Sequence, residues 1–179
     1  TIQLVTALNP IHDIFKIKRI IVSTYQSTSG AGKKAMDELF NQTLDVYKNK
    51  SLKSEVFSKQ IAFNIIPQID IFLDDGKTKE ELKLIQETKK ILDTKIKVFA
   101  TCVRVPVFIG HALSVNIETQ LTINEKKVRK ILNDFEGVNL VDDPLKSEYI
   151  TPDEIAGKDE VFVSRIRKDD SVKNGLSLW

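Results

Sequence analysis

The sequence of 179 residues is poor in cysteine and carries little net charge. Its one cysteine, Cys102, cannot form an internal disulfide, which excludes the disulfide framework typical of small secreted proteins. A reducing compartment, the cytoplasm, is therefore the expected location. The formal net charge is only +2, and the lysines are spread along the chain among acidic residues, so no nucleic-acid partner is expected.

The sequence also lacks a long apolar run, a leader peptide and an initiator methionine. No apolar run reaches the roughly 20 residues of a membrane-spanning helix, so no membrane partner is expected. The opening residues TIQLVTALNPIHD show neither a basic leader nor a small-residue cleavage site. Thr1 opens directly into an apolar pattern and the chain stops at the apolar run NGLSLW, so we expect a piece excised from a longer protein.

Helical periodicity marks four segments, and β-branched or alternating apolar residues mark at least six others. The expected helices cover residues 2–15 with a break or kink at Pro10, about 33–47, 79–92 and 125–136. The expected strands are 18–25, 97–106, 113–122, 138–141, 160–167 and 175–179, with 61–66 either strand or loop and 144–157 a loop region. This order predicts an α+β fold, with a mainly antiparallel mixed sheet and helices on one face.

Local signals refine two of these helices. Thr78 and Glu81 form a T-x-x-E capping box, and Asn124 can cap the last helix, which Gly137 ends. The side chains expected to face the core are Leu82, Ile85 and Leu92 on the first of these helices, and Val128, Ile131, Leu132 and Phe135 on the second. No G-x-G-x-x-G follows a predicted strand, so we expect no nucleotide-binding domain within residues 1–179.

The most specific segment for chemistry is RVPVFIGH, in which Arg104 ends an apolar strand and His111 follows a glycine turn. A guanidinium fork suits a bidentate grip on a carboxylate, and an imidazole suits general acid–base work near neutral pH. The alternative is an edge-strand surface charge and a loop histidine with no catalytic task. The residues alone leave both interpretations open.

Two further segments allow a functional interpretation. The strand-to-helix segment YQSTSGAG, with Gln26, Ser29 and Gly30, has small residues that let a ligand approach the backbone, although on its own it is more typical of an ordinary strand-to-helix turn. Glu80 and Lys83 are spaced i and i+3, so they share one helix face, where a routine surface ion pair is the simpler interpretation.

Taken together, these segments resemble the bacterial aspartate-semialdehyde dehydrogenases. The resemblance runs through TIQL, STYQSTSGAG, EELKLIQETKKIL, RVPVFIGHALSVNIE, VFVSRIRKDD and NGLSLW, and so covers essentially the whole chain. It implies the C-terminal domain of the glyceraldehyde-phosphate-dehydrogenase type, which binds substrate and dimerises, and assigns residues 1–179 to that domain. It also implies a biosynthetic enzyme of the lysine, threonine and methionine pathways, which reduces L-aspartyl-4-phosphate with NADPH through a cysteine thioester.

The resemblance assigns a role to each candidate residue. His111 matches the acid–base histidine, and Gln26 the glutamine that orients the acyl intermediate. Arg104, Glu80 and Lys83 match the groups that bind the substrate carboxylate, ammonium and phosphate. Ser29 and Gly30 match the family's loop that lies near the nicotinamide of NADP. No metal site is expected, and the expected partners are a small-molecule substrate and further copies of the chain, in a homodimer or homotetramer.

The chain departs from the family pattern at the nucleophile. The family reads Asn-Cys-Ser/Thr-Thr-Ile-Gln, which places the reactive cysteine two positions before Thr1. Cys102 lies within a predicted strand and is interpreted as a packed core thiol. We therefore predict that residues 1–179 alone are inactive. A dimerisation module without ligand function, and a related acyl-phosphate reductase of the N-acetylglutamyl-phosphate or glyceraldehyde-phosphate type, remain as alternatives.

Overall fold

A computed structural model describes all residues, 1–179. The helices are α1 (Ile2–Phe15), α2 (Lys33–Tyr47), α3 (Lys79–Ile91) and α4 (Glu125–Asn133). The strands are β1 (Ile17–Gln26), β2 (Lys97–Arg104), β3 (Ala112–Thr119), β4 (Val138–Leu140), β5 (Val161–Val163), β6 (Arg167–Asp169) and β7 (Gly175–Leu178). Short 3-10 helices span Thr28–Ala31, Pro144–Lys146 and Pro152–Ile155. None of the helices is both long and apolar enough to cross a membrane.

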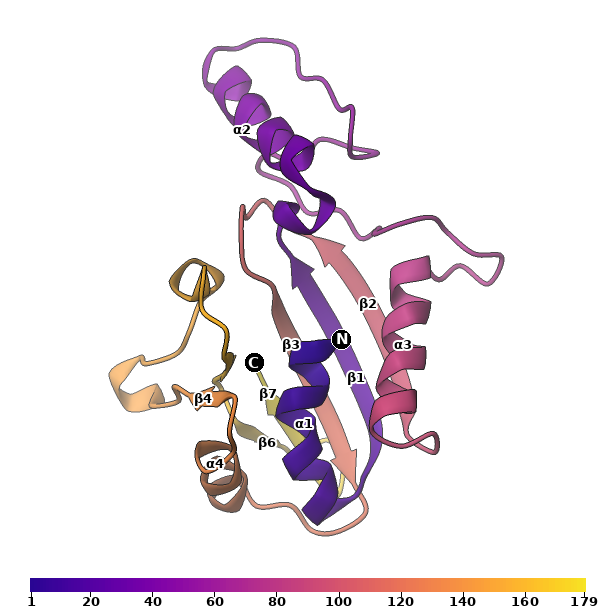
Figure 1. Cartoon of the computed structure of the whole chain (residues 1–179), viewed down its shortest axis with the longest axis vertical. Coiled ribbons are helices and arrows are strands. Elements are labelled where there is room, and N and C mark those ends of the chain that lie inside the picture. The colour runs from indigo at the N-terminus through magenta and orange to yellow at the C-terminus, as the bar shows by residue number, and fades with distance from the viewer.

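The five-stranded sheet has the order β2-β1-β3-β7-β6. Only the β1–β2 pair is parallel, and the other three pairs are antiparallel. Helices α1, α3 and α4 lie on one face, while α2 and the long loop after it extend beyond the end of the sheet (Figure 1). Strands β4 and β5 form a separate parallel pair. The predicted α+β class, with a mainly antiparallel mixed sheet and helices on one face, is confirmed.

The core lies between this sheet face and α1. Alternate residues of the strands, among them Ile20 and Ile117, are fully buried, because the side chains of a strand point to opposite faces in turn. From the helix side, Leu8 and Ile11 are also fully buried one turn apart. The helix runs unbroken through Pro10, so no break separates its two halves.

The opposite face of the sheet is covered by no helix of this chain. It presents a mixture of charged, hydroxyl and apolar side chains: Arg19, Ile21, Ser23, Tyr25, Phe99, Thr101, Ser114, Asn116 and Ser177. Phe99 is 59% exposed there. A sheet face with exposed aromatic and aliphatic side chains is suited to contact another protein surface.

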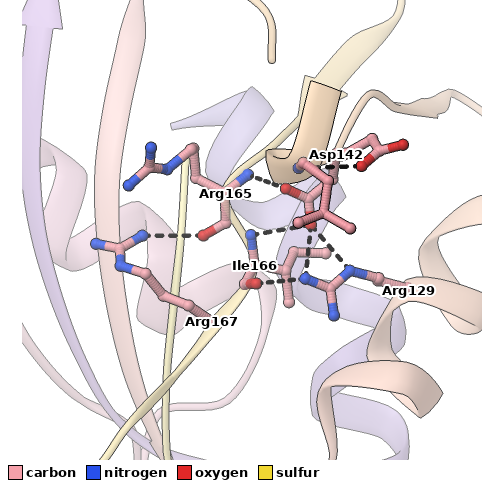
Figure 2. A network of polar contacts seen from close by, with 7 residues as sticks. Arg129, Asp142, Arg165, Ile166 and Arg167 are labelled. Atoms are coloured by element: carbon pink, nitrogen blue, oxygen red, sulfur yellow. Dashed lines mark hydrogen bonds and ion pairs between the residues drawn. The ribbon is translucent and has the colours of Figure 1, made fainter. Parts of the chain in front are cut away.

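The prediction of one strand over residues 160–167 is wrong. The segment divides into β5 and β6, which belong to different sheets. Asp142 causes the break, because its carboxylate accepts hydrogen bonds from the backbone N–H groups of Arg165 and Ile166, at 2.7 and 3.2 Å (Figure 2). Arg165 consequently adopts a left-handed conformation with φ of 59°.

Two smaller predictions also need correction. The inward leucine of α3 is Leu84, which is 2% exposed, whereas Leu82 is only half-buried; Ile85 and Leu92 do pack against the core. Phe135 lies beyond the end of α4 and is half-buried. Of the two alternatives for residues 61–66, strand or loop, the loop is confirmed, and only Ile66 makes a β-bridge, to Arg104.

Candidate functional site

The candidate residues gather where β1 and β2 end. Because the two strands run parallel, their carboxyl ends meet at one edge of the sheet, and Gln26 lies beside Arg104 in the register. The chain then leaves both strands through loops. The N–H groups of Thr28 and Ser29 donate to the carbonyls of Val107 and Phe108 at 2.8 and 2.9 Å. The loop after β1 is therefore held against the segment that carries His111.

Ser27 connects the two candidate residues of the RVPVFIGH segment. Its backbone N–H donates to Nδ1 of His111 at 3.0 Å, and its carbonyl accepts from Nη1 of Arg104 at 2.6 Å. Since Nδ1 accepts this bond, the neutral imidazole carries its proton on Nε2. Burial lowers the pKa of His111, and the charge of Arg104 adds to this shift, so the ring is neutral at physiological pH.

Gly30 shows that Arg104 and His111 face the same space. A Cβ atom built on Gly30 would lie 3.2 Å from Nη1 of Arg104 and 3.3 Å from Nε2 of His111. Such contacts are tighter than ordinary van der Waals packing, so the absence of a side chain lets both groups close over the loop. The donor nitrogens of both groups thus converge beside one glycine.

Arg104 is buried without an anionic partner. It is 6% exposed and forms no ion pair, and the hydrogen bond to Ser27 is the one bond its side chain makes. Burial lowers its pKa, and the charge of Glu80 acts in the opposite direction. A buried cation without a counter-ion is costly, which makes the guanidinium a strong receptor for an incoming carboxylate.

Glu80 and Lys83 complete the cluster from the first turn of α3. Oε1 of Glu80 accepts from Nε2 of Gln26 at 3.4 Å, and the Lys83 ammonium lies 3.8 Å from the Glu80 carboxylate. The Lys83 side chain is 59% exposed, at the outer edge of the cluster. The capping box predicted from Thr78 and Glu81 is present and fixes where this helix begins.

Cys102 lies on the same strand face as Arg104 but points into the core. It is fully buried, and burial raises the pKa of its thiol to about 11. Its backbone N–H donates to the Glu81 carboxylate at 3.0 Å. The prediction of a packed core thiol is confirmed by this complete burial. The raised pKa also disfavours the thiolate at neutral pH.

Residues 8–179 of this chain match the family model described as "Semialdehyde dehydrogenase, dimerisation domain". The chain belongs to the semialdehyde dehydrogenase dimerisation-domain family. A curated relative, aspartate-semialdehyde dehydrogenase of Aquifex aeolicus, is 51% identical over 181 residues, covering 100% of this chain and 53% of the relative. The chain thus spans about half the length of the curated relatives that it matches.

Solved structures agree with this membership. Aspartate semialdehyde dehydrogenase II of Vibrio cholerae, complexed with ASA, is 47% identical with a TM-score of 0.96, covering 100% of this chain and 53% of that one. The enzyme of Candida albicans, solved with NADP, is 22% identical with a TM-score of 0.67, covering 98% of this chain and 49% of that one. Because only 22% of the residues are identical, the likeness to the Candida albicans enzyme shows a shared fold alone.

In this semialdehyde dehydrogenase domain, sequence reasoning missed two residues that contact His111. Gln3 of α1 donates from Nε2 to the His111 carbonyl at 3.3 Å, and Ser27 makes the backbone bonds described above. Neither bond has a sequence signature beyond proximity to a named motif. Ser29, which the resemblance did select, bonds to the Ser27 hydroxyl at 2.9 Å.

A cavity of about 370 Å³ adjoins His111 on the side of α1 and was also missed. Gln3, Gly110 and Pro152 contribute to its lining. Gly110 has φ of +93°, and a Cβ there would lie 2.5 Å from the Pro152 carbonyl, so the glycine allows residues 150–157 to close over the loop. Gly110 is the one residue in the sequence that could have indicated this close approach.

Proposed function

We propose that the whole protein carrying residues 1–179 is an NADP-dependent aspartate-semialdehyde dehydrogenase, which converts L-aspartyl-4-phosphate to L-aspartate 4-semialdehyde and phosphate. In this proposal residues 1–179 form its substrate-binding and dimerisation domain. The observation that carries the proposal is the convergence of Arg104 and His111 on Gly30. The family membership and the names of the relatives support it.

The charges of the cluster complement this substrate. Arg104, buried and without an anion, binds the α-carboxylate through its guanidinium fork. Glu80 binds the α-ammonium, and the exposed Lys83 approaches the phosphate. Gln26, held by Glu80 and Thr24 at 3.4 and 3.2 Å, orients the acyl group.

The chemistry requires a thiolate and a proton carrier. The family pattern places the reactive cysteine two positions before Thr1, next to the N-terminus of α1, whose dipole favours the thiolate. The thiolate attacks the acyl phosphate, the C–O bond to phosphate breaks, and a thioester forms. When the thioester is then reduced, His111 offers its Nε2–H to the thioester oxygen, on which negative charge develops, since Nδ1 is occupied by the N–H of Ser27.

When bound, NADPH would supply the hydride for reduction of the thioester. The small residues Ser29, Gly30 and Ala31, of which Ser29 is half-buried and the other two are exposed, allow close approach of a flat ring, so they fit the nicotinamide end. We assign no other part of the cofactor to residues 1–179.

Residues 1–179 alone are proposed to be inactive, because the buried Cys102 is the only cysteine they contain. The test is to assay the whole protein and residues 1–179 side by side, following NADPH formation from aspartate semialdehyde, phosphate and NADP. Turnover by the whole protein alone is expected. Turnover by residues 1–179, or turnover of glyceraldehyde 3-phosphate or N-acetylglutamate semialdehyde in place of the aspartate compound, would contradict the proposal.

A second proposal concerns self-association. The uncovered sheet face, with Phe99 59% exposed, suits docking of a second copy, and the family description names a dimerisation domain. Sedimentation velocity at micromolar concentration tests this. A dimer that Phe99→Glu dissociates supports the proposal, and a monomeric wild-type protein contradicts it. The same measurement separates dimer from tetramer.

The expectation of a cytoplasmic location stays a prediction.

A further inference from the structure

The hydroxyl group of Ser27 takes no part in the backbone contacts that connect His111 with Arg104. Ser27 is fully buried, and its Oγ lies 3.1 Å from Nδ1 of His111 and 2.9 Å from Oγ of Ser29. A hydroxyl group can donate one hydrogen bond and accept others at the same time. Because Ser29 is half-buried, the two hydroxyl groups connect the imidazole with a side chain that water can reach.

The two hydrogen-bonding groups of Ser27 suit different forms of the His111 ring. In the neutral ring with its proton on Nε2, the lone pair of Nδ1 accepts the backbone N–H of Ser27 at 3.0 Å. Once Nδ1 carries a proton it is a donor, and a backbone N–H cannot accept from it. Oγ of Ser27, at 3.1 Å, is then the acceptor within reach.

Full proton transfer from Nε2 of His111 needs a proton at Nδ1. A neutral ring that gave away its Nε2 proton without gaining another would become an imidazolate anion. A buried site strongly disfavours such an unpaired charge. The proton on Nε2 can therefore leave as another proton arrives at Nδ1, where the Ser27 hydroxyl lies.

We propose that Ser27 and Ser29 relay a proton from water to Nδ1 of His111, which makes Ser27 a positioning residue that acts through the histidine. Oγ of Ser27 gives its proton to Nδ1 and takes the proton of Oγ of Ser29, which water replaces. The Nε2–H bond breaks, its proton passes to the negatively charged oxygen of the reduced thioester, and the ring remains neutral with Nδ1–H bonded to Oγ of Ser27.

The relay keeps the proton balance between substrate and solvent. The substrate oxygen gains one proton, water loses one, and both serine hydroxyl groups are restored. When aspartate semialdehyde is oxidised, the same transfers run in reverse. This role rests on the proposed dehydrogenase function, because it requires a substrate oxygen that takes or gives a proton at Nε2.

Nuclear magnetic resonance of residues 1–179 tests the contact at Nδ1 without any turnover. The main core lies wholly within these residues, and they contain only two histidines, so a His111→Gln variant identifies the His111 signal. Ser27→Ala removes the hydroxyl group and keeps the backbone N–H and carbonyl. The pKa of His111 should fall by about one unit, because the protonated ring loses its acceptor at Nδ1.

The other charges that face His111 stay in place in this comparison. Arg104 of β2 and the Thr1 ammonium lower the pKa of His111 together with burial, and Glu80 of α3 raises it. None of these groups bonds to the Ser27 hydroxyl, which contacts His111 and Ser29. A difference between wild type and Ser27→Ala therefore reports on the hydroxyl group.

Steady-state kinetics of the whole protein tests the relay itself. Ser27→Ala should lower kcat about tenfold, because a hydrogen bond to a charged ring is lost. KM for aspartate semialdehyde should stay at the wild-type value, since the Ser27 carbonyl still accepts from Arg104. Ser29→Ala should lower kcat at saturating NADP while leaving the pKa of His111 nearly unchanged, because the contact between Ser27 and His111 remains.

Ser51→Ala is the control, because Ser51 is exposed and lies outside the site. It should keep the wild-type pKa of His111 and the wild-type kcat. Circular dichroism establishes that each variant is folded.

Two results would overturn the proposal while leaving the proposed function intact. The first is an unchanged pKa of His111 in Ser27→Ala, or an equal fall in Ser51→Ala. The second is a wild-type kcat in Ser27→Ala. A whole protein without any dehydrogenase turnover would instead overturn the proposed function, and the relay with it, even where the pKa of His111 shifts as expected.

Discussion

On the sheet face covered by helices, the buried side chains change from apolar to polar along β1 and β2. Near the start of these strands the inward side chains are apolar, as at Ile20 and Ala100, and they join the main core. At the carboxyl ends the same face presents Thr24 and Arg104, which are equally buried but polar. One end of a single surface therefore provides stability, and the other end holds polar groups that a packed core would exclude.

The largest effect is expected at His111, at the polar end. Replacing His111 by alanine in the whole protein should lower turnover about 10²- to 10⁴-fold, because the proton carrier is lost. Steady-state kinetics of NADPH formation measures this. Lys126→Gln, on the exposed side of α4, is the control and should keep wild-type rates. A His111 variant with normal turnover would remove the acid–base role.

A change at the apolar end should act on stability instead. Ile117→Ala, at a fully buried core position, should cost about 3 kcal/mol, from lost apolar transfer and an unfilled cavity. Urea unfolding gives this value. Leu145→Ala is the control, because Leu145 is 98% exposed, and its cost should stay within about 0.5 kcal/mol. Equal costs for the two substitutions would deny that the core lies where the structure places it.

Glu80 and Glu81 are adjacent carboxylates for which we predict different roles, ligand binding for Glu80 and stability for Glu81. Glu81 accepts the N–H groups of Thr78 and Cys102 at 2.8 and 3.0 Å, so Glu81→Ala should cost about 2 kcal/mol of stability. Glu80→Ala should leave the urea midpoint nearly unchanged and raise KM for aspartate semialdehyde. If the two variants exchange these effects, the division between structural and ligand-binding carboxylates is wrong.

Gly30 and Gly32 form another matched pair. Gly30→Ala places a Cβ against Arg104 and His111, and we expect about tenfold slower turnover because both groups are displaced. Gly32→Ala meets no atom within 4 Å but strains a φ of +87°, so about 1 kcal/mol of stability is lost with activity retained. Kinetics and urea unfolding of both variants separate crowding of the site from backbone strain.

The smallest effect concerns pH. Burial and the charge of Arg104 lower the pKa of His111 in the folded protein, so the unfolded chain binds the proton more tightly. His111 therefore favours folding above pH 6.5, and this contribution declines as the pH falls below that value toward the folded pKa. His111→Gln should flatten this decline in urea midpoints. If the urea midpoint of the variant depends on pH as it does in the wild type, burial does not lower the pKa of His111.

Sequence reasoning succeeded where the signal was local. Alternation predicted β3, and the T-x-x-E spacing predicted the cap at Thr78, because neighbouring residues determine both features. It failed where distant residues decide the structure. Asp142 divides residues 160–167 from more than twenty positions away, and no propensity of the segment itself shows this.

The candidate site was partly predictable for the same reason. Arg104 and His111 were found by residue type and family pattern, and the structure brings them together. Ser27 was missed because it contributes mainly its backbone N–H and carbonyl, which every residue except proline possesses. The Asp142–Arg165 network was equally invisible, since a buried carboxylate bonded to backbone is not a sequence motif.

The most direct test of the account is the kinetics of Arg104→Lys in the whole protein. Lysine keeps the charge but loses the guanidinium fork, so kcat/KM for aspartate semialdehyde should fall about 100-fold or more, with little change in the urea midpoint. Wild-type kcat/KM in a folded Arg104→Lys variant would contradict the claim that the polar end of β1 and β2 is the substrate site.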